Sequence, residues 1–372
     1  MQISELLTPV YDAAWLPWAV QYFFLIGISA TTALTAAFAA FGSQGSPARR
    51  LLPAAATVLL VTAIAAPVSL LADLHQPGRF WHFYTQATPW SWMWLGALLL
   101  PVFVGLAVLF CAAWWWGRIG WARLVGVALA LSAVSILVYT GAEVMVLRSR
   151  PLWHTVFLPV NFALTAWLGA LGAMFLVGRW LPGGMKALPV GMLRQLSLAA
   201  VVLMALGAGA WGLLGTLGID PSFDAALRLF ADFPIWRISL AGAVITAFCM
   251  IALLQRPARA LAAPLPSAAL ALTMLAAAWI FRWVVFMSVQ GVPKYGAGLY
   301  LYDMPWGSDG LLGMTGVLGL CVALVTATAW ALERFPARAR HGGLIRRKTN
   351  AHGRQSNGQA TRRRQAWRRQ HA

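Results

Sequence analysis

The 372 residues are 60% hydrophobic and only 10% charged, with a mean hydropathy of +0.71 and a net charge of +18. A soluble domain carries roughly 25% charged residues because its surface faces water, so the composition excludes an ordinary soluble enzyme. Apolar runs of about 20 residues instead predict helices that cross a bilayer.

Residues 1–16 contain acids but no Lys or Arg, so they lack the positive region of a secretory signal, and we expect a periplasmic N-terminus. Nine apolar runs follow, at residues 17–41, 51–73, 91–116, 124–147, 155–181, 196–218, 235–255, 265–290 and 311–333. Backbone amides in hydrocarbon must be paired, and the alternation of a membrane barrel is absent. The predicted fold is therefore all-α, a polytopic transmembrane bundle of about nine helices over residues 17–333.

The distribution of Lys and Arg predicts the orientation. Most of the 28 basic residues fall in alternate loops, on the side that also receives residues 334–372. The positive-inside rule places this side in the cytoplasm of a bacterial inner membrane. The low-complexity basic tail is predicted to be disordered. It either stops transfer and aids solubility or binds anionic membrane lipid, and nucleic-acid binding is not expected of a chain tethered to a bilayer.

Cofactor ligands are missing from the predicted spans. Cys111, Cys249 and Cys321 lie in separate spans without a C-x-x-C pair, so no iron–sulfur cluster is expected. No predicted span contains a histidine, which argues against haem, and no metal site is expected.

Polar residues inside the membrane are costly, and several gather toward the outer side of the first, second and fourth spans. Asp73 ends the second span, and Tyr139 and Glu143 share one face of the fourth because they are four residues apart. Gln21 and Tyr22 lie one turn into the first span, where Gln21 could equally bond across helices and Tyr22 could anchor the interface. We interpret these residues as a functional polar cleft.

The outer loop after the second span contains His75, Arg79 and His82, which either serve the cleft or fix the loop. Late in the chain, Arg237 opens the seventh span and Arg282 lies well inside the eighth. Together they could mark a proton route, although Arg282 could also snorkel outward or pair with an acid such as Asp303 or Asp309. The following loop is long and rich in Gly, Tyr and Trp, which suggests a docking surface.

Four segments resemble the polysulfide-reductase (NrfD-like) family of membrane subunits, and within it the membrane subunits of tetrathionate reductases. The segments are WLPWAVQYFFLIGIS, LLADLHQPGRFWHFYTQATPWSWMWLGALLLPVF, YTGAEVMVLRSRPLWHTVFLPVNFALTAWLGALG and FRWVVFMSVQGVPKYGAGLYLYDMP. The resemblance covers roughly residues 14–332. It implies an anchor for two periplasmic partners, a molybdopterin catalytic subunit and an iron–sulfur electron-transfer subunit.

The resemblance also implies that menaquinol or ubiquinol is oxidised near the outer face by helices within residues 17–147. Residues 155–333 would form a second helical bundle. The family's pocket aspartate and tyrosine fall on Asp73 and Tyr139, whereas Gln21 stands near a family histidine. Haem, iron–sulfur clusters and molybdenum are not expected in this chain. The expected role is tetrathionate reduction in anaerobic respiration. A related polysulfide or sulfur-compound reductase, a secondary transporter and a purely structural anchor are the alternatives.

Overall fold

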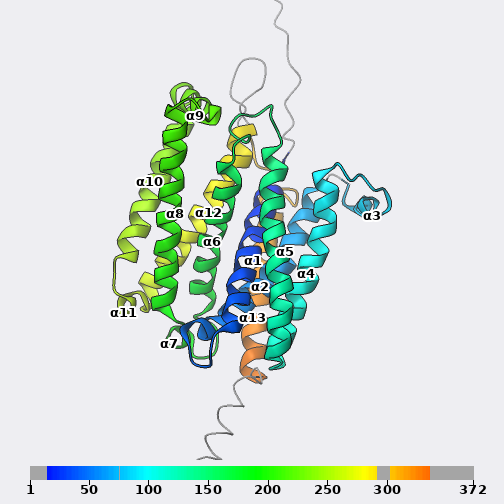
Figure 1. The fold of residues 1–372 in the computed structure, drawn as a ribbon, viewed down its shortest axis with the longest axis vertical. Coiled ribbons are helices and arrows are strands. Elements are labelled where there is room, and N and C mark those ends of the chain that lie inside the picture. The colour runs from blue at the N-terminus through cyan, green and yellow to red at the C-terminus, as the bar shows by residue number, and fades with distance from the viewer. Residues whose placement is uncertain (1–14, 75, 291–301, 336–372) are drawn as a thin grey trace, which may run out of the picture.

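The computed structural model describes residues 15–74, 76–290 and 302–335, and within them it consists of helices and connecting loops without a strand (Figure 1). His75, nearly all of the predicted N-terminal segment and basic tail, and the first part of the late docking loop with Lys294 lie outside the described residues.

Nine helices among the described residues are long and apolar enough to cross a membrane, which confirms the predicted all-α class and number of spans. They are α1 (Pro17–Phe41), α2 (Pro47–Asp73), α4 (Trp92–Trp115), α5 (Ile119–Met145), α6 (Phe157–Val177), α8 (Val190–Thr216), α10 (Pro234–Leu254), α12 (Pro264–Trp283) and α13 (Leu311–Arg334). A π-helical segment, η2 (Val284–Ser288), continues α12. The short helices are η1 (Pro77–Arg79), α3 (His82–Thr85), α7 (Gly184–Ala187), α9 (Pro221–Asp232) and α11 (Ala258–Leu261).

Helix α2 begins four residues before the predicted span, because its first turn is capped. The Ser46 hydroxyl accepts a hydrogen bond from the Arg49 backbone N–H at 3.2 Å, and Pro47 occupies the first helical position. The Arg49 guanidinium donates to the Ala40 carbonyl at 3.0 Å, so its charge sits on the end of α1 instead of interrupting α2.

Helix α9 was not predicted, since its sequence mixes apolar and charged residues and is too short to span a membrane. Asp220 caps it by accepting hydrogen bonds from the Ser222 backbone N–H at 2.9 Å and from the Thr155 hydroxyl at 2.6 Å. The Trp211 indole N–H donates to the Ser222 hydroxyl at 2.9 Å, which ties α9 to α8. These bonds hold α9 across one end of the bundle (Figure 1).

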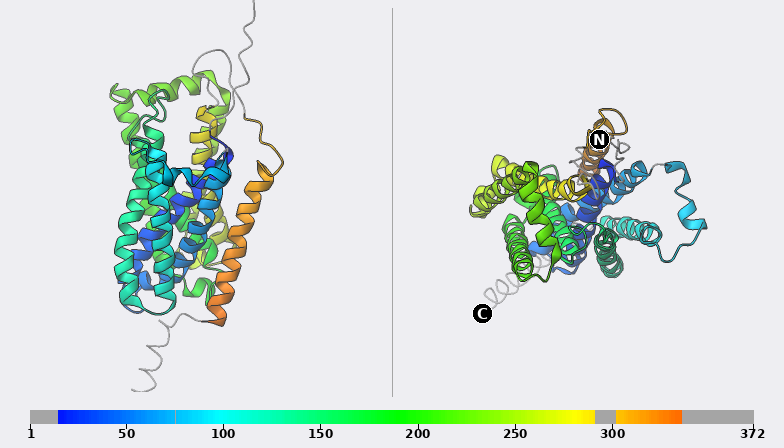
Figure 2. Two further views of the ribbon diagram at one scale, coloured as in Figure 1. Left: turned by 90° about the vertical axis from the view of Figure 1, so that its right-hand side faces the viewer. Right: turned by 90° about the horizontal axis from the view of Figure 1, so that it is seen from above.

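Helix α1 is the centre of the bundle. It packs against α2, α5, α6, α12 and α13, and most of its side chains are buried. Helices α8, α10 and α13 lie at the edge, and their outward side chains are apolar and exposed, as expected where a helix faces lipid. Figure 2 shows α13 at the rim, where it packs mainly on α2. The predicted division into helices before and after residues 147–155 stays a prediction.

The two ends of the bundle differ in charge. Helices α3 and α9 lie at one end and α7 and α11 at the other (Figure 1). The α7–α11 end carries a set of basic residues: Arg49, Arg50, Arg118, Arg123, Arg179, Lys186, Arg194, Arg256 and Arg259. Fewer basic residues lie at the α3–α9 end. The positive-inside rule therefore favours a cytoplasmic α7–α11 end, and this orientation stays a prediction.

Candidate functional site

A cavity of about 320 Å³ lies toward the α3 end, between α1, α2, α4 and α5. Four side chains named from the sequence line it together: Tyr22 from α1, Asp73 from α2, and Tyr139 and Glu143 from α5. The remaining walls are largely aliphatic and aromatic side chains, which α2, α4 and the loop before α4 supply. The cavity is therefore an apolar pocket with a few convergent polar groups, the usual composition of a small-molecule site.

Tyr139 and Glu143 form the polar centre of this cavity. Their side chains interact with each other, as the spacing of one helical turn predicts, and both are buried. The Glu143 carboxylate is close enough to interact electrostatically with Tyr22 and with Asp73. The phenols of Tyr22 and Tyr139 and two carboxyl groups thus surround one small volume, and these groups can exchange hydrogen bonds and protons with a bound molecule.

Asp73 is the last residue of α2 and is half-buried. The C-terminal end of a helix is an unfavourable place for a carboxylate, because the helix dipole is negative there. The stability of α2 therefore does not account for an acid at this position. A role in the cavity, which Asp73 lines, does account for it.

Gly96 of α4 was not named from the sequence, although its missing side chain leaves the space that the Tyr139 ring occupies. A Cβ atom built on Gly96 would lie 2.8 Å from Tyr139 Cε1 and would collide with Cζ and the hydroxyl oxygen. Only a residue without a side chain allows α4 to approach the tyrosine this closely. No sequence signal distinguishes Gly96 from the other glycines of the apolar spans.

Arg79 and His82 line a separate, more polar hollow of about 410 Å³ next to the cavity. The two spaces share a wall of Leu74, Phe80 and Phe83. Arg79 and His82 are thus close neighbours of the cavity but do not line it, and residues of α3 line both spaces.

Gln21 is fully buried but faces away from the cavity. Its side-chain Nε2 donates to the Met314 carbonyl at 2.9 Å, so the residue joins α1 to the first turn of α13. The structure therefore places the Gln21 amide in helix packing, the alternative that the sequence left open. Its neighbour Tyr22 points into the cavity instead.

Arg282 is buried at the junction of α1, α6 and α12. Its guanidinium donates to the Phe23 carbonyl at 2.9 Å, the Phe162 carbonyl at 3.1 Å and the Thr165 hydroxyl at 3.2 Å. These bonds go to neighbouring helices, and the side chain does not snorkel outward. Arg237 is exposed and donates to the Phe230 carbonyl at 2.8 Å, at the end of α9. A proton route through the two arginines stays a prediction.

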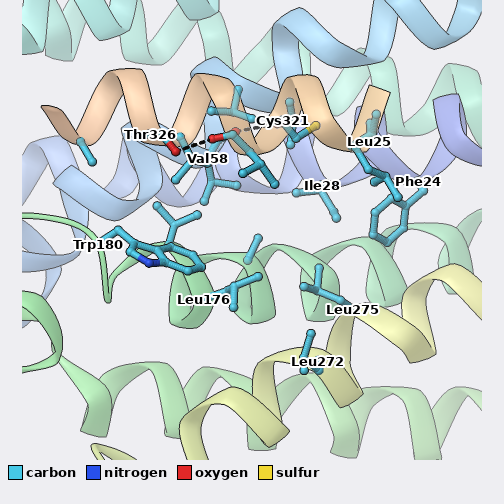
Figure 3. Close-up of a pocket in the computed structure, with 18 of the residues that line it drawn as sticks. Phe24, Leu25, Ile28, Val58, Leu176, Trp180, Leu272, Leu275, Cys321 and Thr326 are labelled. Carbon is cyan, nitrogen blue, oxygen red and sulfur yellow. Dashed lines mark hydrogen bonds between the residues drawn. The ribbon is translucent and has the colours of Figure 1, made fainter. Parts of the chain in front are cut away.

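A larger groove of about 870 Å³ runs between α13 and helices α6 and α12, over α1 and α2 (Figure 3). Its lining is almost entirely apolar, and the labelled Thr326 hydroxyl is bonded to its own helix at Val322. Glu333, at one end, is the one acid in the lining. None of the site residues named from the sequence lines this groove, and it lacks the converging polar groups of the smaller cavity.

Comparison with known proteins identifies the family to which the chain belongs. The model of the family described as polysulphide reductase, NrfD, matches residues 7–294. One tetrathionate reductase subunit of Salmonella typhimurium is 34% identical to this chain over 348 residues, which cover 91% of this chain and 98% of the relative. Together with the spanning helices, these matches identify a multi-pass membrane protein of the kind that anchors a reductase complex. The chain therefore belongs to the NrfD polysulphide reductase family.

Proposed function

We propose that this membrane subunit oxidises quinol and passes the electrons to an iron–sulfur subunit of a periplasm-facing complex. The observation that carries the proposal is the cavity in which Asp73, Tyr139 and Glu143 meet inside apolar walls. The catalytic partner would be a molybdopterin subunit. Tetrathionate is the proposed terminal acceptor, because the relative belongs to a tetrathionate reductase. The family description makes another sulfur-compound reductase, such as one for polysulfide, the second candidate.

Quinol oxidation removes two protons and two electrons from the two hydroxyl groups of one ring. The site therefore needs a hydrogen-bond partner for one quinol oxygen and a proton acceptor near the other. The Tyr139 hydroxyl can donate or accept a hydrogen bond, and the Asp73 carboxylate can accept a proton. Glu143, which interacts with Tyr139, supplies a second carboxylate. The aliphatic walls on α2 and α4 would hold the ring and the start of the isoprenoid chain.

Electrons and protons would leave toward the α3 end. His82 in the neighbouring hollow, and His75, which lies seven residues earlier in the sequence, would relay protons to water, since an imidazole can both donate and accept a hydrogen bond. Trp90 and Trp306 are each 82% exposed, on the loops that follow α2 and η2. Exposed aromatic side chains are enriched in protein interfaces. We propose that the iron–sulfur subunit docks on these two loops, around residues 81–90 and 294–306.

The test compares quinol-driven turnover with turnover driven by a dye that reduces the partner subunits directly. Asp73→Asn should lower the quinol-driven rate by about 10²–10⁴-fold, if Asp73 accepts a proton in the transition state. Tyr139→Phe removes one neutral hydrogen bond and should weaken quinol binding by about 0.5–1.5 kcal/mol. Glu143→Gln should give an intermediate loss, and all three should keep the dye-driven rate.

Glu333→Gln is the matched control, because it makes the same change to an acid that lines the larger groove instead. Its quinol-driven rate should equal that of the wild type. Rates are measured in membranes with equal subunit levels. Wild-type quinol rates in both Asp73→Asn and Tyr139→Phe would exclude the cavity as the quinol site.

A further inference from the structure

A second cleft lies at the α7–α11 end, between α4 and α5. Its volume is about 410 Å³, and the small side chains of Ala112 and Ala113 form part of its apolar lining. Trp116, Arg118 and Trp121 line it where α4 turns into α5. It lies on the same two helices as the quinol cavity but near their opposite ends.

The turn between the helices explains this arrangement. Gly117 has a φ of 72°, a left-handed conformation that glycine adopts readily and that commonly ends a helix. The chain therefore reverses within a few residues, and α5 starts at Ile119. Trp116 and Arg118 flank the glycine, and Trp121 lies in the first turn of α5, so two indoles and one guanidinium meet at the cleft.

Arg118 differs from most of the other arginines at this end in having no partner among the described residues. Five of them donate hydrogen bonds to backbone carbonyl groups: Arg49, Arg50, Arg123, Arg179 and Arg194. The Arg118 guanidinium makes no hydrogen bond, ion pair or ring contact with any residue that the structure describes, and it is exposed. Its charge is thus available to a ligand from outside the chain.

The exposed side chains around the cleft are those expected of a surface that faces lipid. Trp116 is 63% exposed and Trp121 60% exposed, and the adjoining exposed side chains of α4 and α5 are aliphatic, among them Leu109 and Leu124. Tryptophan is enriched at the membrane interface, where the indole ring meets the headgroups. No acidic residue is among the residues that line the cleft. A ligand here would meet a positive charge at the headgroup level and an apolar channel below it.

We propose that this cleft binds one anionic phospholipid of the leaflet at the α7–α11 end. Arg118 would bind the phosphate, the indoles of Trp116 and Trp121 would flank the headgroup, and an acyl chain would lie along Ala112 and Ala113. The single positive charge without a neighbouring carboxylate favours a net negative headgroup over a zwitterionic one.

The proposal predicts a selective, charge-dependent lipid site on the full-length chain. Purified protein in detergent is titrated with phosphatidylglycerol, phosphatidylethanolamine or phosphatidylcholine, and bound lipid is counted by native mass spectrometry. One phosphatidylglycerol should be held more tightly than either zwitterionic lipid. Arg118→Gln should weaken that binding about fivefold, the effect of one basic residue near a lipid surface. Arg256→Gln, which removes an exposed arginine at the same end but outside the cleft, should change nothing.

Ala113→Phe tests the acyl part of the cleft while keeping the charge. It should reduce phosphatidylglycerol binding even though Arg118 is intact, and photoreactive phosphatidylglycerol should cross-link the wild type within residues 109–125. Equal affinity for the three lipids, equal losses in Arg118→Gln and Arg256→Gln, or cross-links that fall elsewhere would each overturn the proposal. Quinol-driven turnover should be unchanged in these variants, which confirms that they fold.

Discussion

Gly96→Ala tests whether the position of Tyr139 sets the rate of quinol oxidation. The new Cβ would lie 2.8 Å from Tyr139 Cε1 and closer to the rest of the phenol, whereas carbon atoms in contact are about 3.5–4.0 Å apart. The ring would therefore have to move by roughly 1 Å, a misplacement that can cost about 100-fold in rate. Overpacking of this kind also destabilises a protein by about 1–3 kcal/mol.

The assay measures quinol-driven and dye-driven turnover in membranes that contain equal amounts of the subunit. We expect Gly96→Ala to lose at least as much quinol-driven activity as Tyr139→Phe and to keep the dye-driven activity. Gly105→Ala is the matched control, since it lies on the same helix and a Cβ there meets nothing within 4 Å. A quinol rate in Gly96→Ala equal to that in Gly105→Ala would refute the reasoning.

Three further predictions concern the fold. Arg282→Gln removes buried charged hydrogen bonds between helices and should destabilise the protein by about 1.5–3 kcal/mol in thermal unfolding, whereas Arg237→Gln, at an exposed position, should cost less than about 0.5 kcal/mol. Burial raises the pKa of Asp220, but the hydrogen bonds that its carboxylate accepts lower that pKa by more. The stability that Asp220 contributes to the fold should therefore be lost as pH falls through its folded-state pKa. The same contribution should be missing in Asp220→Ala at neutral pH. A periplasm-dependent reporter should be active at residues 80–88 and silent at 43–46; the reverse would overturn the orientation.

Hydropathy predicted the spans because a membrane helix must be apolar over its whole length. Hydropathy misplaced the end of a span where charged side chains find hydrogen-bond partners within the protein. Arg49 and Arg50 looked like the end of a loop, yet their guanidinium groups bind the Ala40, Lys186 and Ala187 carbonyls, and α2 continues through them. These hydrogen bonds depend on the position of another loop, and the hydropathy of the sequence carries no information about that position.

The candidate site was predictable in part for a similar reason. Helical geometry alone places Tyr139 and Glu143 side by side, and the end of a hydrophobic run locates Asp73 near the surface of the membrane. Helical geometry does not say which neighbour a side chain meets. Gln21 turned to α13, a contact between residues far apart in sequence, and the role of Gly96 depends on the approach of α4 to α5.

The arrangement of the two carboxylates gives them different roles in the proposed reaction. Glu143 is buried and interacts with Tyr139, so it is suited to take a proton beside the bound ring. Asp73 is less buried and precedes Leu74, which belongs to the wall shared with the hollow of Arg79 and His82. A proton that leaves toward the hollow would pass beside this wall, and Asp73 is the ionisable cavity residue next to Leu74 in sequence. Loss of the Asp73 charge would therefore block both acceptance and exit, whereas loss of Glu143 leaves the exit intact. This asymmetry is the physical reason to expect the larger defect in Asp73→Asn.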